Sequence, residues 1–216
     1  MDTNNKWDFW IDCGGTFTDI VAIDTNGSYQ TEKLLTKSPH YKSSVVQGIK
    51  NLLGDDFSPK IINKVRLGTT VATNAFLERD GIDCALVTTL GFRDLLEIRR
   101  QNRPRLFDLD IKKAKPLYKT VVNIKERIDA SGNIITKLDE EIAYFELMRL
   151  YEQGLRSVAI ALMHSCINPE HELKVAQIAK NIGFEYISLS HQTSPISKYV
   201  YRAETSVVDA YLTPLL

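Results

Sequence analysis

The 216-residue sequence lacks several features that would place it in a specialised class of protein. It has no excess of either charge, because 27 lysines and arginines balance 27 aspartates and glutamates. A chain without net charge has no bulk attraction for nucleic acid or for an anionic membrane surface. No apolar run approaches the ~18 residues that a membrane-spanning helix needs, and the first residues carry no hydrophobic signal core. We therefore expect a cytoplasmic protein that binds neither nucleic acid nor membrane.

Cysteine is scarce, and its distribution argues against a disulfide framework. The three cysteines, Cys13, Cys84 and Cys166, are odd in number, far apart, and form no Cys-x-x-Cys pair. This pattern favours reduced thiols. His164 and His171 lie close in sequence, but no third metal ligand accompanies them, so we favour a structural role for both.

The common fingerprints of nucleotide-binding and hydrolytic sites are also missing. The sequence contains no P-loop motif Gly-x-x-x-x-Gly-Lys-Ser/Thr and no Gly-x-Gly-x-x-Gly after a strand. It likewise contains no Gly-x-Ser-x-Gly and no His-Glu-x-x-His. P-loop, Rossmann, serine hydrolase and zinc protease interpretations therefore have no support.

The most informative segment that is present is residues 12–19, Asp-Cys-Gly-Gly-Thr-Phe-Thr-Asp. It lies between the apolar runs 7–11 and 20–23, so it predicts a tight hairpin between two strands. A third strand is expected at residues 29–35 and a helix at 41–53. Three antiparallel strands followed by a helix is a distinctive order.

The predicted hairpin has the residues of a phosphate-binding site. Gly14 and Gly15 let the backbone turn sharply and expose its amides, and the hydroxyls of Thr16 and Thr18 add donors. Asp12 supplies a carboxylate of the kind that Mg²⁺ prefers. The alternative is an ordinary Gly-Gly hairpin without a ligand.

A second candidate anion site is predicted further along the chain. Residues 64–68 are expected to be a strand, 69–79 a helix and 84–88 a buried strand, which together would make a parallel crossover. Gly68, Thr69 and Thr70 would then lie where the strand meets the helix N-terminus, where free amides gather. The alternative is an ordinary threonine cap.

The remainder is expected to alternate between strands and helices up to residue 212. Arginines are concentrated in residues 99–105, which would suit a carboxylate or phosphate clamp or simply a solvated surface. Residues 90–118 have few patterns typical of a helix or a strand, and we interpret them as a loop, a lid or a crossover. The predicted domains are a phosphate-binding lobe at 1–89, a second αβ segment at 90–196, and a helix at 197–216 that leads toward a further lobe.

Several of these segments together resemble the hydantoinase A / 5-oxoprolinase family, in order and over nearly the whole chain. The 5-oxoprolinase branch is favoured by the opening Phe-Trp-Ile-Asp, by residues 103–109, and by Leu67, where hydantoinase-type members often have His. Cys13 and Ser165 depart from the family pattern. The segments that carry the resemblance are 9–20 (FWIDCGGTFTDI), 68–79 (GTTVATNAFLER), 86–94 (LVTTLGFRD), 101–104 (QNRP), 162–165 (LMHS), 168–172 (NPEHE), 194–195 (SP) and 208–214 (VDAYLTP).

The resemblance implies an α/β fold of the actin/hexokinase-like (ribonuclease H-like) ATPase type. It would comprise an N-terminal lobe with a mixed sheet and a second, smaller αβ lobe. ATP and Mg²⁺ are the implied cofactors, because in that superfamily the first hairpin holds the β- and γ-phosphates and an aspartate orients the metal. Carried onto matching positions, the phosphate contacts are Asp12, Gly14, Gly15, Thr16 and Thr18, with Asp12 also the metal residue. Gly68, Thr69, Thr70 and Asn74 would line the site more loosely.

The implied activity is ATP-dependent opening of the lactam of 5-oxo-L-proline to L-glutamate. One alternative is the A-type component of a hydantoinase, acting on hydantoin-like cyclic amides, or of a related ATP-dependent carboxylase. Another is a non-catalytic fragment with a structural or partner-binding role.

Family members are far longer than 216 residues, and no second phosphate hairpin is found. We therefore expect an N-terminal fragment that works with a C-terminal lobe and a hydantoinase B-type domain or subunit. The full-length protein would be an oligomer, and the fragment alone would bind ATP weakly or not at all. The catalytic residues are not identified by the sequence.

Overall fold

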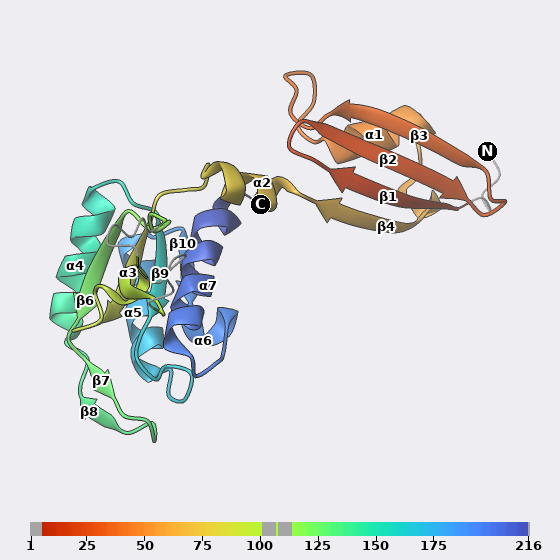
Figure 1. Ribbon diagram of the computed structural model, residues 1–216. Coiled ribbons are helices and arrows are strands. Elements are labelled where there is room, and N and C mark those ends of the chain that lie inside the picture. Colours follow the sequence, from red (N-terminus) through yellow and green to blue (C-terminus); the bar gives the residue numbers. More distant parts are fainter. Residues whose placement is uncertain (1–5, 101–106, 108–113, 216) are drawn as a thin grey trace. The chain divides into compact units, whose positions relative to one another are not determined.

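The computed structural model describes residues 6–100, 107 and 114–215 of the chain (Figure 1). The chain divides into two compact units, Met1–Glu78 and Arg79–Leu216.

The first unit is a four-stranded mixed sheet with one long helix. The strand order is β3-β2-β1-β4, with β1 antiparallel to β2, β2 antiparallel to β3, and β1 parallel to β4. The predicted mixed sheet and the order of three strands before a helix are therefore confirmed. The elements are β1 (Trp7–Cys13), β2 (Phe17–Asp24), β3 (Tyr29–Leu35), α1 (Ser44–Leu53), the 3₁₀ turn η1 (Pro59–Ile61), β4 (Ile62–Thr69) and α2 (Val71–Glu78).

The core of the first unit lies between the sheet and α1. Because alternate residues of a strand point to opposite faces, Phe9 and Ile11 of β1 share a face with Ile20 and Ala22 of β2. These side chains pack with Ile49 of α1. The side chain of Ser43 caps the helix N-terminus by accepting a hydrogen bond from the Val46 amide. The packed face fixes the register of β1 and β2, and so fixes the turn between them.

The second unit is built on a parallel sheet of order β10-β9-β5-β6, and β7 and β8 form a separate antiparallel hairpin. Its strands are β5 (Cys84–Thr89), β6 (Thr120–Ile124), β7 (Arg127–Ile128), β8 (Ile134–Thr136), β9 (Ser157–Ala161) and β10 (Tyr186–Leu189). Its helices are α3 (Leu95–Ile98), α4 (Glu140–Glu152), α5 (Glu170–Ile182), α6 (Ser190–Thr193), α7 (Tyr199–Leu212) and the 3₁₀ turn η2 (Thr213–Leu215).

Helices cover both faces of this parallel sheet. Ala85 and Val87 of β5 belong to a core shared with α4 and α5, whereas Cys84 and Leu86 belong to a core shared with α7. Figure 1 shows α7 on one side of the sheet and α4 on the other. All residues of β5 and β9 are buried, which explains why both strands are mostly apolar and show no alternation of polar and apolar residues.

The division into units differs from the predicted domains. The predicted crossover from 64–68 to 84–88 is wrong, because β4 pairs with β1 while β5 pairs with β6 and β9 of the other sheet. The boundary consequently falls after Glu78 rather than at residue 89. Residues 197–216 also belong to the second unit, since α7 forms part of its core. This unit is the larger of the two, not the smaller.

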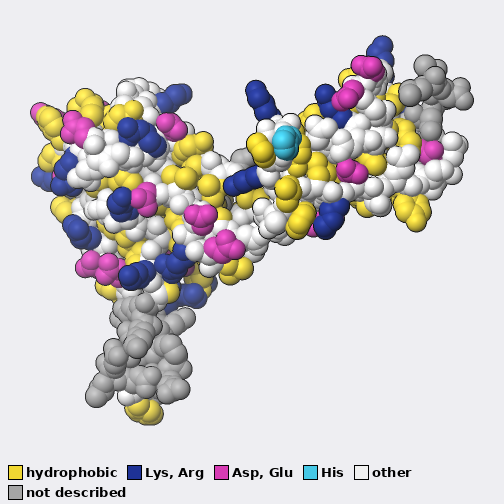
Figure 2. Space-filling view, turned by 90° about the horizontal axis from the view of Figure 1, so that it is seen from above, with side chains coloured by type: hydrophobic (Ala, Val, Ile, Leu, Met, Phe, Trp, Pro, Cys, Tyr) yellow, Lys and Arg dark blue, Asp and Glu magenta, His cyan; other side chains and the backbone are white. Residues whose placement is uncertain are grey.

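The surface carries both signs of charge. Figure 2 shows Lys and Arg side chains interspersed with Asp and Glu on the visible face of each unit. Among the described residues, none of the helices combines the length and apolar character required to cross a bilayer.

Candidate functional site

The predicted hairpin forms between β1 and β2. In the β1–β2 ladder, Asp12 lies opposite Asp19 and Cys13 lies opposite Thr18. The Gly14 amide donates to the Phe17 carbonyl at 2.9 Å. The chain therefore reverses at Gly15 and Thr16. Figure 1 shows this turn at the same end of the sheet as the junction between β4 and α2.

The turn presents several polar groups without a protein partner. Within the described parts of the chain, the amides of Gly15 and Thr16 and the Thr16 hydroxyl form no hydrogen bond. The carboxylate of Asp12 has neither a hydrogen bond nor an ion pair there. Asp12, Gly15 and Thr16 are all exposed. Consecutive backbone amides left open in a turn form a concave site that suits an anion.

Gly14 and Gly15 were expected to allow a sharp backbone turn, but the structure gives a different reason for glycine at these positions. Neither lies in the left-handed region of φ. A Cβ atom at Gly14 would lie 3.0 Å from the Phe17 carbonyl oxygen, and one at Gly15 would lie 3.1 Å from Nδ2 of Asn74. Close approach of a neighbouring atom, rather than backbone conformation, therefore disfavours a side chain at both positions, more strongly at Gly14, where the neighbour is backbone.

The second predicted anion site is adjacent to the first. Because β1 and β4 are parallel, their carboxyl ends meet, with Asp12 opposite Gly68 and Cys13 opposite Thr69. The Thr70 amide donates to the Cys13 carbonyl at 3.2 Å. Ligands of α/β proteins commonly bind beyond the carboxyl ends of parallel strands. The two motifs, far apart in sequence, thus make one candidate site.

Two of the predicted contact residues have other roles in the structure, and a third shows no close approach that requires glycine. Thr18 is fully buried, and its hydroxyl lies 2.8 Å from Ser44 Oγ and 3.1 Å from Thr36 Oγ1, so it does not face the open side of the turn. The Thr69 hydroxyl donates to the Cys13 carbonyl and accepts from the Val71 amide, which is the capping role considered as the alternative. A Cβ atom at Gly68 would meet only an ordinary contact at 3.9 Å.

The residues present fit a magnesium ion held mainly by phosphate oxygens and water. Asp12 offers one exposed carboxylate, while Asp19 across the hairpin is paired with Lys33 at 2.7 Å. Throughout the described residues there is no group of three or more His, Cys, Asp or Glu side chains that could enclose a metal. Mg²⁺ in nucleotide sites is usually bound by one or two carboxylates together with the substrate phosphates, so one carboxylate is sufficient.

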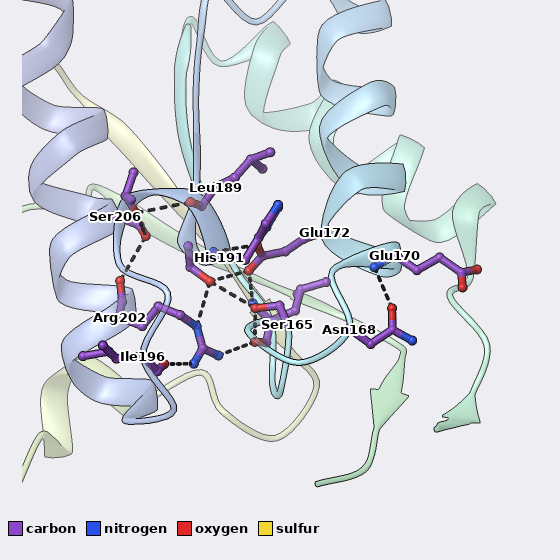
Figure 3. A network of polar contacts seen from close by, with 12 residues as sticks. Ser165, Asn168, Glu170, Glu172, Leu189, His191, Ile196, Arg202 and Ser206 are labelled. Atoms are coloured by element: carbon purple, nitrogen blue, oxygen red, sulfur yellow. Dashed lines mark hydrogen bonds and ion pairs between the residues drawn. The ribbon is translucent and has the colours of Figure 1, made fainter. Parts of the chain in front are cut away.

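A second polar cluster lies at the carboxyl ends of β9 and β10 in the second unit (Figure 3). Its centre is Glu172, which is fully buried at the start of α5. The carboxylate accepts from the Leu162 amide at 2.9 Å, from Ser190 Oγ at 2.5 Å, and from Nδ1 of His191 at 2.5 Å. These bonds compensate the carboxylate for the loss of water.

Arg202 of α7 completes this cluster. Its guanidinium donates to Ser190 Oγ at 3.0 Å and to the carbonyls of Leu162 and Ile196, both at 2.8 Å. Ser165, which departs from the family pattern, is buried and donates to the Leu162 carbonyl at 3.0 Å. The bonds tie the ends of two strands to α5 and α7, so the cluster is structural.

The two histidines singled out in the sequence do not converge on a metal. Nδ1 of His171 lies 2.7 Å from buried Glu126, and Nδ1 of His164 lies 2.8 Å from the Ile128 carbonyl. Each ring is held by a different partner, which supports the structural interpretation.

The arginine-rich segment is only partly described. Arg99 pairs with Glu204 at 3.5 Å, and Arg100 contacts Tyr201. Arg103 and Arg105, together with the rest of 101–106 and with 108–113 of the predicted loop or lid, lie outside the described residues.

The structure is that of an α/β protein with a mixed sheet, and its first hairpin leaves the Gly15 and Thr16 amides without a partner among the described residues. The hydantoinase/oxoprolinase N-terminal region matches residues 8–183, and the chain belongs to this family. It is 41% identical to a 5-oxoprolinase of Dictyostelium discoideum over 96% of its own length, which is 19% of that protein. The chain thus spans about a fifth of the length of this curated relative.

Two solved structures share the fold. An ATP-dependent caprolactamase from Pseudomonas jessenii matches 96% of this chain and 32% of its own, with a TM-score of 0.77 and 29% identity. A nucleotide-free acetone carboxylase, described as an enzyme of ATP-dependent acetone carboxylation, matches 98% of this chain and 32% of its own. Its TM-score is 0.80 at 22% identity, which shows the fold alone.

Proposed function

We propose that this chain is the phosphate-binding N-terminal part of an ATP-dependent enzyme that opens the lactam of 5-oxo-L-proline to L-glutamate. The observation that carries the proposal is the β1–β2 turn, whose Gly15 and Thr16 amides are exposed and unpaired beside the exposed carboxylate of Asp12. The 41% identity to a 5-oxoprolinase supports this choice of substrate. The similarity to an ATP-dependent caprolactamase supports a cyclic amide as the substrate class.

The chemistry requires such a turn. A lactam carbonyl is a poor electrophile, and transfer of the γ-phosphoryl group of ATP to its oxygen activates the ring carbon toward water. Enzymes that move phosphoryl groups act mainly by positioning the phosphates and stabilising their charge. In this chain the amides of Gly15 and Thr16 and the Thr16 hydroxyl would donate to the phosphate oxygens. Asp12 would hold Mg²⁺, which neutralises charge on the phosphates when bound.

The remaining parts of the site are proposed to lie elsewhere in the full-length protein. The open turn contacts a phosphate from one side only, and one-sided contact neither neutralises the nucleotide nor excludes water. We therefore assign the adenosine pocket, a second phosphate hairpin and the substrate residues to a C-terminal lobe and a hydantoinase B-type domain or subunit. The 216-residue chain by itself should bind Mg-ATP only weakly and should not turn it over.

The test is an assay of the full-length protein carrying this chain, with 5-oxoproline and hydantoin offered separately. We expect ADP release to depend on 5-oxoproline and to be accompanied by glutamate. Thr16→Ala should lower kcat/KM for ATP by about tenfold or more, because it removes a donor to a charged phosphate. Thr31→Ala, an exposed threonine of β3, is the matched control and should leave the rate unchanged.

The outcomes separate the alternatives. Turnover of hydantoin, or carboxylation of a ketone, in place of 5-oxoproline hydrolysis would move the protein to the hydantoinase or carboxylase branch. An ATPase rate that Thr16→Ala leaves unchanged would favour a non-catalytic role. Micromolar affinity of residues 1–216 alone for Mg-ATP would contradict the need for a second lobe.

A further inference from the structure

Thr36, the residue that follows β3, holds the open turn in place through two hydrogen bonds. Its hydroxyl donates to the Gly14 carbonyl at 2.8 Å, and its amide donates to the Thr16 carbonyl at 2.8 Å. These carbonyls belong to the peptide units on either side of the Gly15–Thr16 peptide. One residue outside the hairpin therefore fixes both peptide units that flank the tip of the turn.

The direction of the open amide follows from this arrangement. In a trans peptide the C=O and the N–H of the same unit point in opposite directions, and the described residues contain no cis peptide bond. With the Gly14 carbonyl turned toward the Thr36 hydroxyl, the Gly15 N–H points away from it. The Thr16 N–H lies between the two fixed peptide units. The bond from the Thr36 hydroxyl therefore keeps the Gly15 amide from turning inward, and the two bonds together restrain the peptide that carries the Thr16 amide.

The Thr36 hydroxyl is itself held by a chain of hydroxyls that runs back to α1. Thr36 Oγ1 lies 3.1 Å from Thr18 Oγ1, which lies 2.8 Å from Ser44 Oγ. Each hydroxyl has a single proton, and Thr36 donates its proton to Gly14. The Thr18 proton has two acceptors beyond Ser44, Thr36 Oγ1 at 3.1 Å and Cys13 Sγ at 3.8 Å, and the shorter contact favours Thr36. In either case Ser44 donates to Thr18. The hydroxyl hydrogen bonds run from Ser44 in the first turn of α1, through Thr18 and Thr36, to the Gly14 carbonyl. Hydrogen bonds linked in this way strengthen one another.

We propose that Thr36 is a positioning residue for phosphate binding, supported by the buried hydroxyls of Thr18 and Ser44. This inference rests on the proposed function, which supplies the phosphates of ATP as the ligand of the open turn. It also gives Thr18 a role through Thr36 instead of through contact with the phosphate. No local motif marks Thr36, since its partners lie in the β1–β2 turn and on β2, far from it in sequence.

The test follows the amide resonances of Gly15 and Thr16 by NMR while Mg-ATP is titrated into the 216-residue chain. In the wild type we expect both resonances to move, with a dissociation constant in the millimolar range. Thr36→Val keeps the shape of the side chain but removes its hydroxyl, and should weaken binding about five- to tenfold. Thr36→Ser restores the donor and should recover most of the affinity. Thr31→Val makes the same change at an exposed position of β3 and should have no effect.

The results test the phosphate role of the turn and the positioning role of Thr36 separately. Wild-type resonances that stay in place throughout a titration to tens of millimolar Mg-ATP overturn the phosphate role of the turn and, with it, this inference. Movement of the resonances with equal affinity in wild type and Thr36→Val overturns the positioning role alone. Equal weakening by Thr36→Val and Thr36→Ser would show that side-chain shape matters rather than the hydroxyl, which also overturns it. If Thr36→Val does not fold, Ser44→Ala removes the first hydroxyl of the series Ser44–Thr18–Thr36. That variant must then weaken binding for the inference to stand.

Discussion

Gly15 and Asn74 approach so closely that a Cβ atom at Gly15 would lie 3.1 Å from Nδ2 of Asn74. The two residues come from different motifs, one at the turn between β1 and β2 and the other inside α2. Their proximity joins these motifs into one site. It also allows the two glycines of the turn to be compared by substitution.

Gly14→Ala should be more damaging than Gly15→Ala. The new Cβ at position 14 would press on the backbone oxygen of Phe17, which cannot move without distorting the turn. At position 15 it would press on the end of the Asn74 side chain, which can rotate away. We expect losses of about 1–3 kcal/mol and less than about 1 kcal/mol respectively.

Urea unfolding followed by tryptophan fluorescence measures this difference, because Trp7 and Trp10 both lie in β1 and report only on the first unit. A larger loss for Gly15→Ala than for Gly14→Ala would contradict the contact argument.

Arg202→Met should strongly destabilise the second unit. The change removes the guanidinium donor from the Ile196 carbonyl and from the buried Leu162 carbonyl, which keeps only its bond from Ser165, and it removes the positive charge near Glu172. Breaking a buried charged network of this kind costs about 3–5 kcal/mol. The measurement is urea unfolding by far-UV circular dichroism, which is dominated by the helices of this unit.

Lys174→Met is the matched control for Arg202→Met. It removes an exposed ion pair with Glu170 and should leave the transition unchanged. The tryptophan transition of the first unit should not move in either variant. A loss of stability in Lys174→Met as large as that in Arg202→Met would show that burial of the network is not the cause.

Cys84 should be unreactive in the folded chain. Burial, and secondarily the charge of Asp83, raises the pKa of its thiol to about 12, so the reactive thiolate is nearly absent at pH 8. Cys13 and Cys166 are partly exposed. With a thiol reagent at pH 8, we expect Cys13 and Cys166 to react first and Cys84 only after urea is added. Modification of Cys84 as fast as Cys13 in the native chain would refute this.

Tyr199 should make the second unit sensitive to alkali. Burial raises the pKa of its phenol from the ordinary 10 to about 12, and its hydroxyl donates to the Ala161 carbonyl at 2.8 Å. The folded state thus favours the protonated phenol. The stabilisation is complete below pH 10 and is lost as the pH rises toward 12, with a total of about 2–3 kcal/mol.

In Tyr199→Phe, the free energy of unfolding should decrease less between pH 10 and 12 than it does in the wild type. At neutral pH the variant should be less stable, because it lacks the hydrogen bond to the Ala161 carbonyl. Tyr29→Phe, at an exposed position of β3, is the control and should retain the wild-type slope. An unchanged slope in Tyr199→Phe would show that another group titrates there.

Much of the local structure could be predicted because it depends on neighbours in sequence. The hairpin at residues 12–19 follows from two apolar runs that flank a Gly-Gly pair. The start of α4 follows from Asp139, whose carboxylate accepts from the Ile142 amide. The end of α5 follows from Gly183, which takes a left-handed conformation with φ of 113°.

The partners of strands could not be predicted in the same way. Residues 64–68 and 84–88 both have the composition of strands, and nothing local shows that they belong to different sheets. The burial of Thr18 could not be predicted either, because it depends on contacts with Ser44 of α1 and with Thr36 after β3. A threonine beside a glycine-rich turn is polar in either case, and the sequence does not show which way it faces.

The sequence by itself determined the longer helices, most strands, the glycine turn and the family, since these depend on short-range pattern, whereas the short helices α3 and α6 were not predicted. Only the tertiary structure decided that β4 joins β1 in one sheet while β5 joins β9 in another, and that the two candidate anion motifs meet at one edge. The physical reason is that strand pairing and side-chain burial draw their free energy from contacts between distant segments. Local composition makes such contacts possible without selecting among them.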